Sequence, residues 1–248
     1  MRPDVAATAM ADVSAAHRQN LVQRVVGVFF TPRATYADVA ARPRWFGVLA
    51  LVVVIAAVGV FAFTSTDVGK QALLDQQVRT MESFGFKIND AQYQRMQDAL
   101  QFAPYTGAAG QIIVLPLMTL IAAGILLGVF NALLGGDASF KQVFATVAHA
   151  NVVLSLSQIF SLPLAYARET MSTATNLAVF FPFLDENSVA ARFLGTIDLI
   201  WVWWMVSLSI GLGVLYKKRT GPIATTLLIV YAAIALVLAA IRTALSGA

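Results

Sequence analysis

The chain has 248 residues, of which 58% are hydrophobic and 12% charged, and its formal net charge is +4. Soluble domains carry about 25% charged residues, so this chain lacks the residues to cover a water-exposed surface and is predicted to be an integral membrane protein. It contains no cysteine, which excludes disulfides, thiolate metal sites and thiol catalysis. The small basic excess is typical of positive loops beside a membrane and does not indicate nucleic-acid binding.

The first 44 residues lack an apolar segment long enough to cross a membrane. Residues 1–18 are rich in alanine and mix acids with bases, which predicts a disordered cytoplasmic tail. Residues 19–44 predict two helices lying on the inner leaflet, because apolar residues recur on one face of the first. Thr31 before Pro32 is the start signal of the second. The residues predicted to contact the inner leaflet are Arg18, Leu21, Arg24, Val25 and Phe29.

Five segments between residues 45 and 245 each hold about 20 predominantly apolar residues, the length needed to cross the hydrocarbon core as a helix. Backbone groups in lipid must find partners within the protein, and the short alternating segments of a β-barrel are absent, so helices are expected. The predicted fold class is therefore all-α, a polytopic membrane protein with five transmembrane helices. The five segments are residues 45–65, 110–134, 140–166, 193–216 and 223–245.

Basic residues predict how these helices are oriented. The short link between the last two segments contains Lys217, Lys218 and Arg219, and arginines also precede the first segment. Because short cytoplasmic loops carry an excess of Lys and Arg, the N-terminus is expected in the cytoplasm and the C-terminus outside. Residues 66–106 have nearly balanced charges and helical apolar spacing, which predicts a short helical extracytoplasmic loop.

Polar side chains inside the predicted spans are the candidate functional residues, since they are costly in lipid and commonly face the interior of a bundle. At 100° per residue, three of those in the third segment form one stripe within about 60°, whereas His149 lies about 160° from Asn151. With polar groups on two faces, the third segment is expected to be central. The candidate intramembrane polar site comprises His149, Asn151, Ser155, Gln158 and Asp198.

The depths of these residues limit which of them can act together. At 1.5 Å per residue, Gln158 and Asp198 each lie about 27 Å from the inner end of their segment, whereas His149 lies about 13 Å from it. A proton relay between His149 and Asp198 is therefore not expected. Two interpretations stay open: hydrogen bonds that hold helices together, which we favour, and a small polar path beside the third segment.

Signatures of enzyme chemistry are absent from the sequence. It contains no H-E-x-x-H, G-x-S-x-G, Walker or G-x-G-x-x-G motif. The predicted spans offer one histidine and one acid, which is too few for a metal site. No enzymatic activity and no cofactor are expected.

Two stretches carry a family resemblance: "LVQRVVGVFFTPRATYADVAARPRW" before the first segment and "LLGGDASFKQVFATVAHANVV" leading into the third. In the second, a glycine-rich turn (Gly135, Gly136) is followed by Phe140 and a polar-dotted helix from Lys141. On these residues the chain, over about residues 20–245, resembles the bacterial branch of the Yip-domain family, whose eukaryotic members are named for interaction with Ypt/Rab GTPases. The "DLYGP" signature of the eukaryotic branch is absent, so the resemblance does not extend to GTPase binding.

The resemblance implies five spans, a cytoplasmic N-terminus and a bacterial inner-membrane location. It also implies a non-enzymatic membrane organiser or adaptor that acts through protein or lipid contacts. Its expected partners are membrane lipids, other membrane proteins or a second copy of the chain, and no nucleic acid. The alternative is a small transporter, channel or lipid-moving protein that uses the polar groups of the third and fourth segments.

Reporter fusions test the predicted orientation. A reporter fused after Lys218 is expected to report the cytoplasm, and one fused at residue 248 the outside, because one further span separates the two points. The measurement is the activity of paired reporters that each work on one side of the membrane. If both fusions report the same side, the five-span prediction is wrong.

Overall fold

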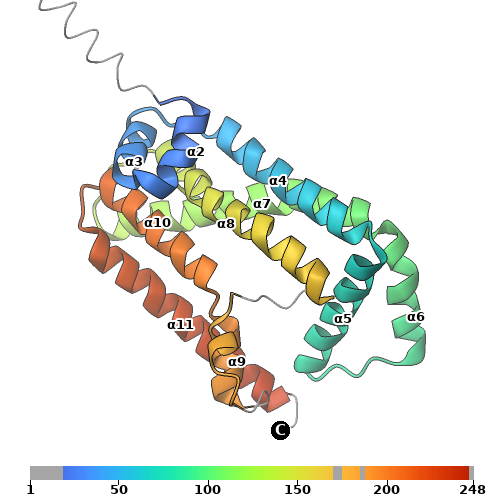
Figure 1. The fold of residues 1–248 in the computed structure, drawn as a ribbon. Coiled ribbons are helices and arrows are strands. Elements are labelled where there is room, and N and C mark those ends of the chain that lie inside the picture. Colours follow the sequence, from blue (N-terminus) through green and yellow to red (C-terminus); the bar gives the residue numbers. More distant parts are fainter. Residues whose placement is uncertain (1–18, 170–174, 185–187, 246–248) are drawn as a thin grey trace, which may run out of the picture.

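The computed structural model describes residues 19–169, 175–184 and 188–245. Within these ranges the secondary structure is helical, which confirms the all-α prediction for the described residues. Figure 1 shows a bundle of long helices with shorter helices at both ends. The predicted tail at residues 1–18 and the predicted lipid contact Arg18 lie outside the described residues.

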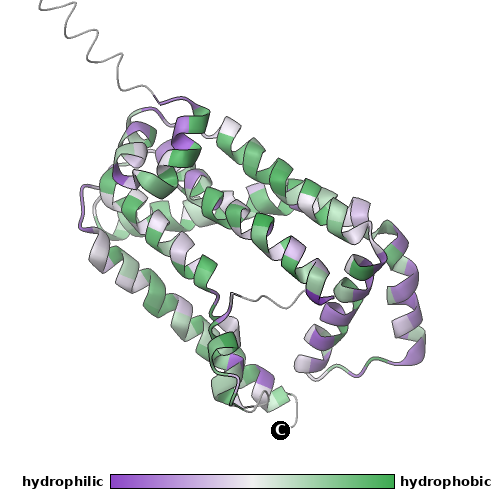
Figure 2. Ribbon diagram, in the orientation of Figure 1, coloured by the Kyte–Doolittle hydropathy of each residue, from purple (hydrophilic) through white to green (hydrophobic). Residues whose placement is uncertain are grey.

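Among the described residues, four helices are long and apolar enough to cross a membrane. They correspond to the first, second, third and fifth predicted segments, and Figure 2 shows that most of their residues are hydrophobic. The second begins at Ala103 rather than at residue 110, and it continues as the π-helix η2 (Gly128–Leu133). The four are α4 (Phe46–Thr64), α7 (Ala103–Leu127), α8 (Phe140–Arg168) and α11 (Thr220–Leu245).

The fourth predicted segment, residues 193–216, is two helices rather than one. α9 (Val189–Thr196) ends before Asp198, whose backbone is extended, and α10 (Leu199–Leu215) starts after it. Asp198 is the N-cap of α10 and accepts a hydrogen bond from the Ile200 N–H at 2.7 Å, as aspartate commonly does at a helix start. The 17 residues of α10 extend about 25 Å, which is less than the ~30 Å hydrocarbon core. Helix length therefore establishes four spanning candidates and not the predicted five.

α8 is the central helix of the bundle, as its polar residues on two faces predicted. α4, α7 and α10 pack against it, and so do α2 (Leu21–Phe30) and α3 (Pro32–Ala41). Of its most apolar 18 residues 67% are buried inside the protein, compared with 33% for α4 and 17% for α11 and for the helical stretch that contains α7. α8 therefore contacts mainly protein, whereas the other three helices mainly face outward.

Residues 19–44 form the hairpin of α2 and α3, which are joined at Thr31, and Pro32 starts α3 as predicted. The apolar face of α2 is divided between the protein and its surroundings. Val25 and Phe29 pack against the hydrophobic core, which leaves them little surface for the predicted contact with the inner leaflet. The large apolar side chains of α2 that remain exposed are Leu21, Val22, Val26 and Phe30.

α3 lies close to both α8 and α10 because residue 211 is glycine. A Cβ on Gly211 would lie 2.6 Å from the Thr146 methyl carbon and 2.9 Å from the Tyr36 ring, closer than packed carbon atoms allow. The Tyr36 hydroxyl and Ser207 Oγ are 2.8 Å apart, which links α3 to α10. Burial raises the pKa of the Tyr36 hydroxyl, so this hydrogen bond is one between neutral groups.

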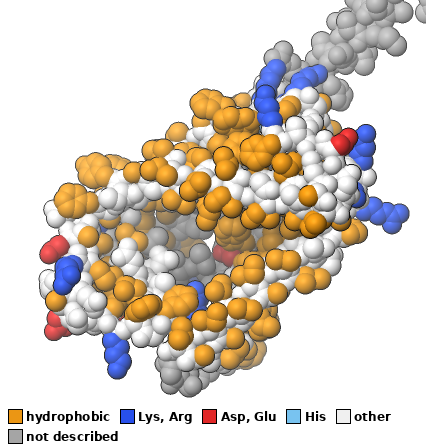
Figure 3. Space-filling view, turned by 180° about the vertical axis from the view of Figure 1, so that it is seen from behind, with side chains coloured by type: hydrophobic (Ala, Val, Ile, Leu, Met, Phe, Trp, Pro, Cys, Tyr) orange, Lys and Arg blue, Asp and Glu red, His pale blue; other side chains and the backbone are white. Residues whose placement is uncertain are grey.

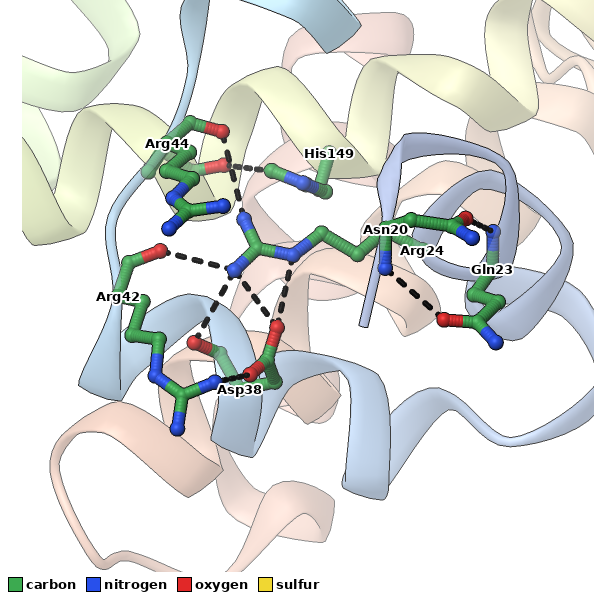
Figure 4. Close-up of polar contacts among 8 residues, drawn as sticks. Asn20, Gln23, Arg24, Asp38, Arg42, Arg44 and His149 are labelled. Atoms are coloured by element: carbon green, nitrogen blue, oxygen red, sulfur yellow. Dashed lines mark hydrogen bonds and ion pairs between the residues drawn. The ribbon is translucent and has the colours of Figure 1, made fainter. Parts of the chain in front are cut away.

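Arg24 was predicted to contact the inner leaflet, and the structure corrects this (Figure 4). Its side chain is 3% exposed, and its guanidinium pairs with the Asp38 carboxylate at 2.6 Å. It also donates hydrogen bonds to the backbone carbonyls of Arg42 at 3.0 Å and Arg44 at 3.5 Å. A buried charge needs such partners because leaving it unpaired away from water is costly. Arg24 therefore fastens α2, α3 and the link to α4 to one another.

The predicted outer loop forms α5 (Asp67–Ser83) and α6 (Asp90–Ala99), which confirms its helical character. Gly85, with φ +80°, lies in the turn between them. The short 3₁₀ helix η1 (Leu100–Phe102) joins α6 to α7, and another, η3 (Leu177–Phe180), precedes α9. α5 and α6 lie at the end of the bundle opposite the α2–α3 hairpin (Figure 1).

Replacing Asp38 tests how far this ion pair stabilises the bundle. Asp38→Asn leaves the Arg24 guanidinium buried without its counter-charge, and loss of one partner of a buried pair commonly costs about 3–5 kcal/mol. We therefore expect a large fall in the thermal unfolding midpoint of the purified protein in detergent.

The matched control is Arg42→Gln, at the other side of the same carboxylate. The contact between Arg42 and Asp38 is 3.4 Å long, and the Arg42 side chain is 36% exposed. Such a pair is commonly worth less than about 1 kcal/mol, so the control should unfold close to the wild type. Equal losses in the two variants would contradict the role assigned to Arg24.

Candidate functional site

A cavity of about 480 Å³ lies over α8, between α7 on one side and α10 on the other. Val114 and Met118 of α7 and Trp201 of α10 line it and are 52%, 59% and 46% exposed, so the cavity is open to the side. In Figure 3 the bundle, seen from behind, has a hollow bordered mainly by hydrophobic side chains. The polar residues that line the cavity are Gln111, Thr119, Asn151, Ser157, Gln158 and Asp198.

Asn151 joins three helices at the floor of this cavity. Its amide nitrogen donates to Thr119 Oγ1 of α7 at 2.9 Å, and its amide oxygen accepts from Trp204 Nε1 of α10 at 2.9 Å. Asn151 is 6% exposed, so both ends of the amide are paired away from the surroundings, as buried polar groups require. Asn151 therefore forms the interhelical hydrogen bonds that its position in α8 predicted.

The partners of Asn151 were not among the predicted site residues. Two features of the sequence could have found them. An indole N–H inside an apolar helix, such as that of Trp204, usually needs a hydrogen-bond acceptor. A helical threonine commonly donates to the carbonyl four residues back, and Thr119 does so to Leu115 at 2.7 Å. Its oxygen thereby remains available as an acceptor for Asn151.

Ser155 and Gln158 do not form the interhelical hydrogen bonds expected of them. Ser155 Oγ lies 3.4 Å from the backbone carbonyl of Asn151 in its own helix. Gln158 Oε1 is buried and has no hydrogen-bond donor among the described residues. It faces α4, since a Cβ on Gly59 would lie 3.9 Å from it. Of the predicted polar stripe, Asn151 is thus the residue that connects helices.

Asp198 lines the cavity together with Gln158, as their equal depth predicted. The Asp198 carboxylate accepts hydrogen bonds from the Ile200 N–H at 2.7 Å and the Thr175 hydroxyl at 2.6 Å. Its backbone N–H donates to the Tyr231 hydroxyl at 3.1 Å, and an isolated antiparallel bridge pairs this residue with position 176. Within the described ranges, both partners of the carboxylate are neutral and it forms no ion pair.

His149 lies apart from the cavity, beside the α2–α3 hairpin (Figure 4). It is fully buried, and its Nδ1 is 2.7 Å from the Ala145 carbonyl oxygen. Its Nε2 has no hydrogen-bond partner in the part of the chain that the structure describes. The charges that act on it are those of Arg24 and Asp38. Asn151, Gln158 and Asp198 line the cavity and His149 lies apart from it, so a proton relay from His149 to Asp198 has no geometric support.

The lining of the cavity is mainly apolar and includes a few polar groups. The described residues contain no group of three or more His, Cys, Asp or Glu side chains that could hold a metal ion. The lining combines apolar side chains from α7, α8 and α10 with a carboxylate and several neutral polar groups. Apolar walls with a few placed polar groups are typical of sites for small molecules and lipids.

The family model of the Yip1 domain matches residues 26–241. The chain belongs to the Yip1-domain family. The matched region runs from α2 to α11 and contains Asn151, its two partners and Asp198. Together with the long apolar helices, the Yip1 domain makes this an integral membrane protein. Comparison with curated proteins found no significant match, and neither did comparison with solved structures.

Replacing Asn151 tests whether it holds the Yip1 domain together. Asn151→Leu removes two interhelical hydrogen bonds, each worth about 0.6 kcal/mol in membrane bundles, and leaves the Trp204 N–H without its acceptor, which adds about 1–3 kcal/mol. We expect a lower thermal unfolding midpoint in detergent. The control, Ser155→Ala, removes a long contact within α8 and should change stability by less than about 0.5 kcal/mol. If both variants unfold like the wild type, Asn151 does not have this role.

Proposed function

We propose that this Yip1-domain protein is a non-enzymatic membrane organiser or adaptor, which acts by holding lipid or membrane-protein partners against its bundle. The observation that carries the proposal is a cavity that is open to the side and closed toward the α2–α3 hairpin. Its lining on α8 starts at Val147, and every residue of α8 from Val143 to Val153 is buried. This arrangement supports a holding role, because a path across the membrane needs a second opening.

We further propose that the chain crosses the membrane five times, with its N-terminus in the cytoplasm. The membrane we propose is a bacterial inner membrane. α10 is apolar and packs against α8 and α11, and a helix slightly shorter than the bilayer can be accommodated by local thinning. The basic link at Lys217 and Lys218 supports this orientation. The exposed Leu21 and Phe30 of α2 then face the inner leaflet.

The second candidate function is a small transporter, channel or lipid-moving protein. The observation that favours it is the polar end of the cavity, where Gln111, Gln158 and Asp198 lie among apolar walls. Transport would require a route past Asn151, whose hydrogen bonds join α7, α8 and α10. The two candidates thus differ in whether Asn151 is a fixed link or part of a moving gate.

Reconstitution of the purified protein into vesicles separates the two candidates. A photoactivatable phospholipid is expected to cross-link more at Met118, which lines the cavity, than at Leu120, which is 50% exposed on the same helix and does not line it. Lipid flip and solute release should equal those of protein-free vesicles. Flux above that background that is lost in Asn151→Leu would contradict the proposal and support transport.

A further inference from the structure

The geometry points to a more specific occupant of the cavity over α8. We infer that it binds one phospholipid whose headgroup carries a primary amine, with the ammonium group at Asp198 and an acyl chain along α8. This inference rests on the proposed function, because it specifies the lipid that the protein holds.

The cavity has the length of one leaflet of a bilayer. Its lining on α8 runs from Val147 to Gln158, eleven residues further along the helix, which is about 16 Å at 1.5 Å per residue. Half of the ~30 Å hydrocarbon core is about 15 Å. One end lies beside the buried N-terminal half of α8 and the other at Asp198, where α10 begins. A lipid chain that lies parallel to α8, in the leaflet on the side of α5 and α6, fits this cavity.

The walls suit an acyl chain along this whole length. They are formed by apolar side chains from α7, α8 and α10 and by Val52 of α4, and methionine among them adapts to irregular apolar shapes. At the deep end, both polar ends of the Asn151 amide are occupied by Thr119 and Trp204, so no unpaired amide group meets the chain there. The apolar side chains that contribute to these walls are Val114, Leu115, Met118, Leu154, Ile200 and Trp201.

The charge at the other end favours a cationic group. Asp198 is the one ionisable side chain among the described residues that line the cavity. A carboxylate offers about four lone-pair sites, and Asp198 uses two for the neutral donors of Ile200 and Thr175. The N-terminus of α10 supplies about half a positive charge. The remaining charge and lone pairs favour an ammonium group, whose three N–H donors can form charge-assisted hydrogen bonds.

The same contacts discriminate between headgroups. A phosphatidylglycerol headgroup would bring a net negative charge next to Asp198, which is unfavourable in a site shielded from water. A choline headgroup has a positive charge and no N–H to donate. Phosphatidylethanolamine supplies both the charge and the donors. Gln111 and Gln158 are neutral amides at the same end of the cavity, and the N–H groups of an amide are donors suited to phosphate oxygens.

The test is a competition between lipids for the full-length protein. Purified protein is equilibrated with equal amounts of phosphatidylethanolamine, phosphatidylcholine and phosphatidylglycerol that carry identical acyl chains. The lipid retained after removal of excess is then counted by native mass spectrometry. We expect about tenfold more phosphatidylethanolamine than either competitor, the size expected for a hydrogen bond to a charged group. Equal retention of phosphatidylcholine, or preference for phosphatidylglycerol, would overturn the inference.

Two variants locate the effect within the cavity. Asp198→Asn keeps an equally good N-cap for α10 and removes the charge, so the headgroup preference should disappear while the amount of retained lipid stays the same. Met118→Trp fills the cavity and should reduce retention of all three lipids. Its matched control is Leu120→Trp on the same helix, which lies outside the lining and should retain lipid like the wild type.

The outcomes separate this inference from the proposed function. The inference is overturned if Asp198→Asn unfolds at the wild-type temperature and still prefers phosphatidylethanolamine, because the headgroup must then bind elsewhere. If the variant does not fold, the competition with the wild type still decides the headgroup. Retention without headgroup preference refutes only the inference. If the wild type retains no lipid, or if Met118→Trp retains as much lipid as the wild type, the lipid-holding function is refuted as well.

Discussion

Burying an amide or a guanidinium away from water is costly unless the group is hydrogen-bonded, and the central position of α8 gives Asn151 its partners. Asn151 uses both ends of its amide, and its partners come from α7 and from α10. α8 must therefore lie between those two helices. Hydroxyl groups impose no such constraint, since Thr146 and Ser209 donate to carbonyls of their own helices at 2.9 and 2.7 Å. The cavity follows from the same geometry, because α7 and α10 stand on either side of α8.

The carboxylates of Asp38 and Asp198 have different kinds of partners. This difference distinguishes the closed end of the bundle from the end with the open cavity. Asp38 is paired with Arg24, whose guanidinium also binds the carbonyls of the link to α4. The ion pair between Asp38 and Arg24 therefore holds the α2–α3 hairpin end of the bundle together. Asp198 has neutral partners, the Ile200 N–H at the start of α10 and the hydroxyl of Thr175. At this end of the bundle, the Asp198 carboxylate can accept further hydrogen bonds at the border of the cavity.

Local pattern was enough to predict the helices, because each apolar segment in lipid must satisfy its own backbone, and polar groups on two faces placed α8 at the centre. Features that depend on which segments meet were missed. Arg24 was assigned to the lipid because spacing within one helix does not reveal its partner acid fourteen residues later on another. Asp198 was placed inside a span because an aspartate within an apolar stretch looks the same whether or not the helix restarts there. The partners of Asn151 are 32 and 53 residues away in the sequence.

Exposure alone does not mark a site on this protein, because lipid is as apolar as the side chains that face it. Ile113 and Ile125 of α7 are 65% and 63% exposed and need no partner beyond the bilayer. The cavity differs because polar side chains, Asp198 among them, line it together with apolar ones. Two buried atoms of α8 lack partners among the described residues, Gln158 Oε1 and His149 Nε2, and they flank the Asn151 link on either side. Asn151 is paired at both ends of its amide, so a lipid held as we propose could enter and leave on the Gln158 side of it without breaking those hydrogen bonds.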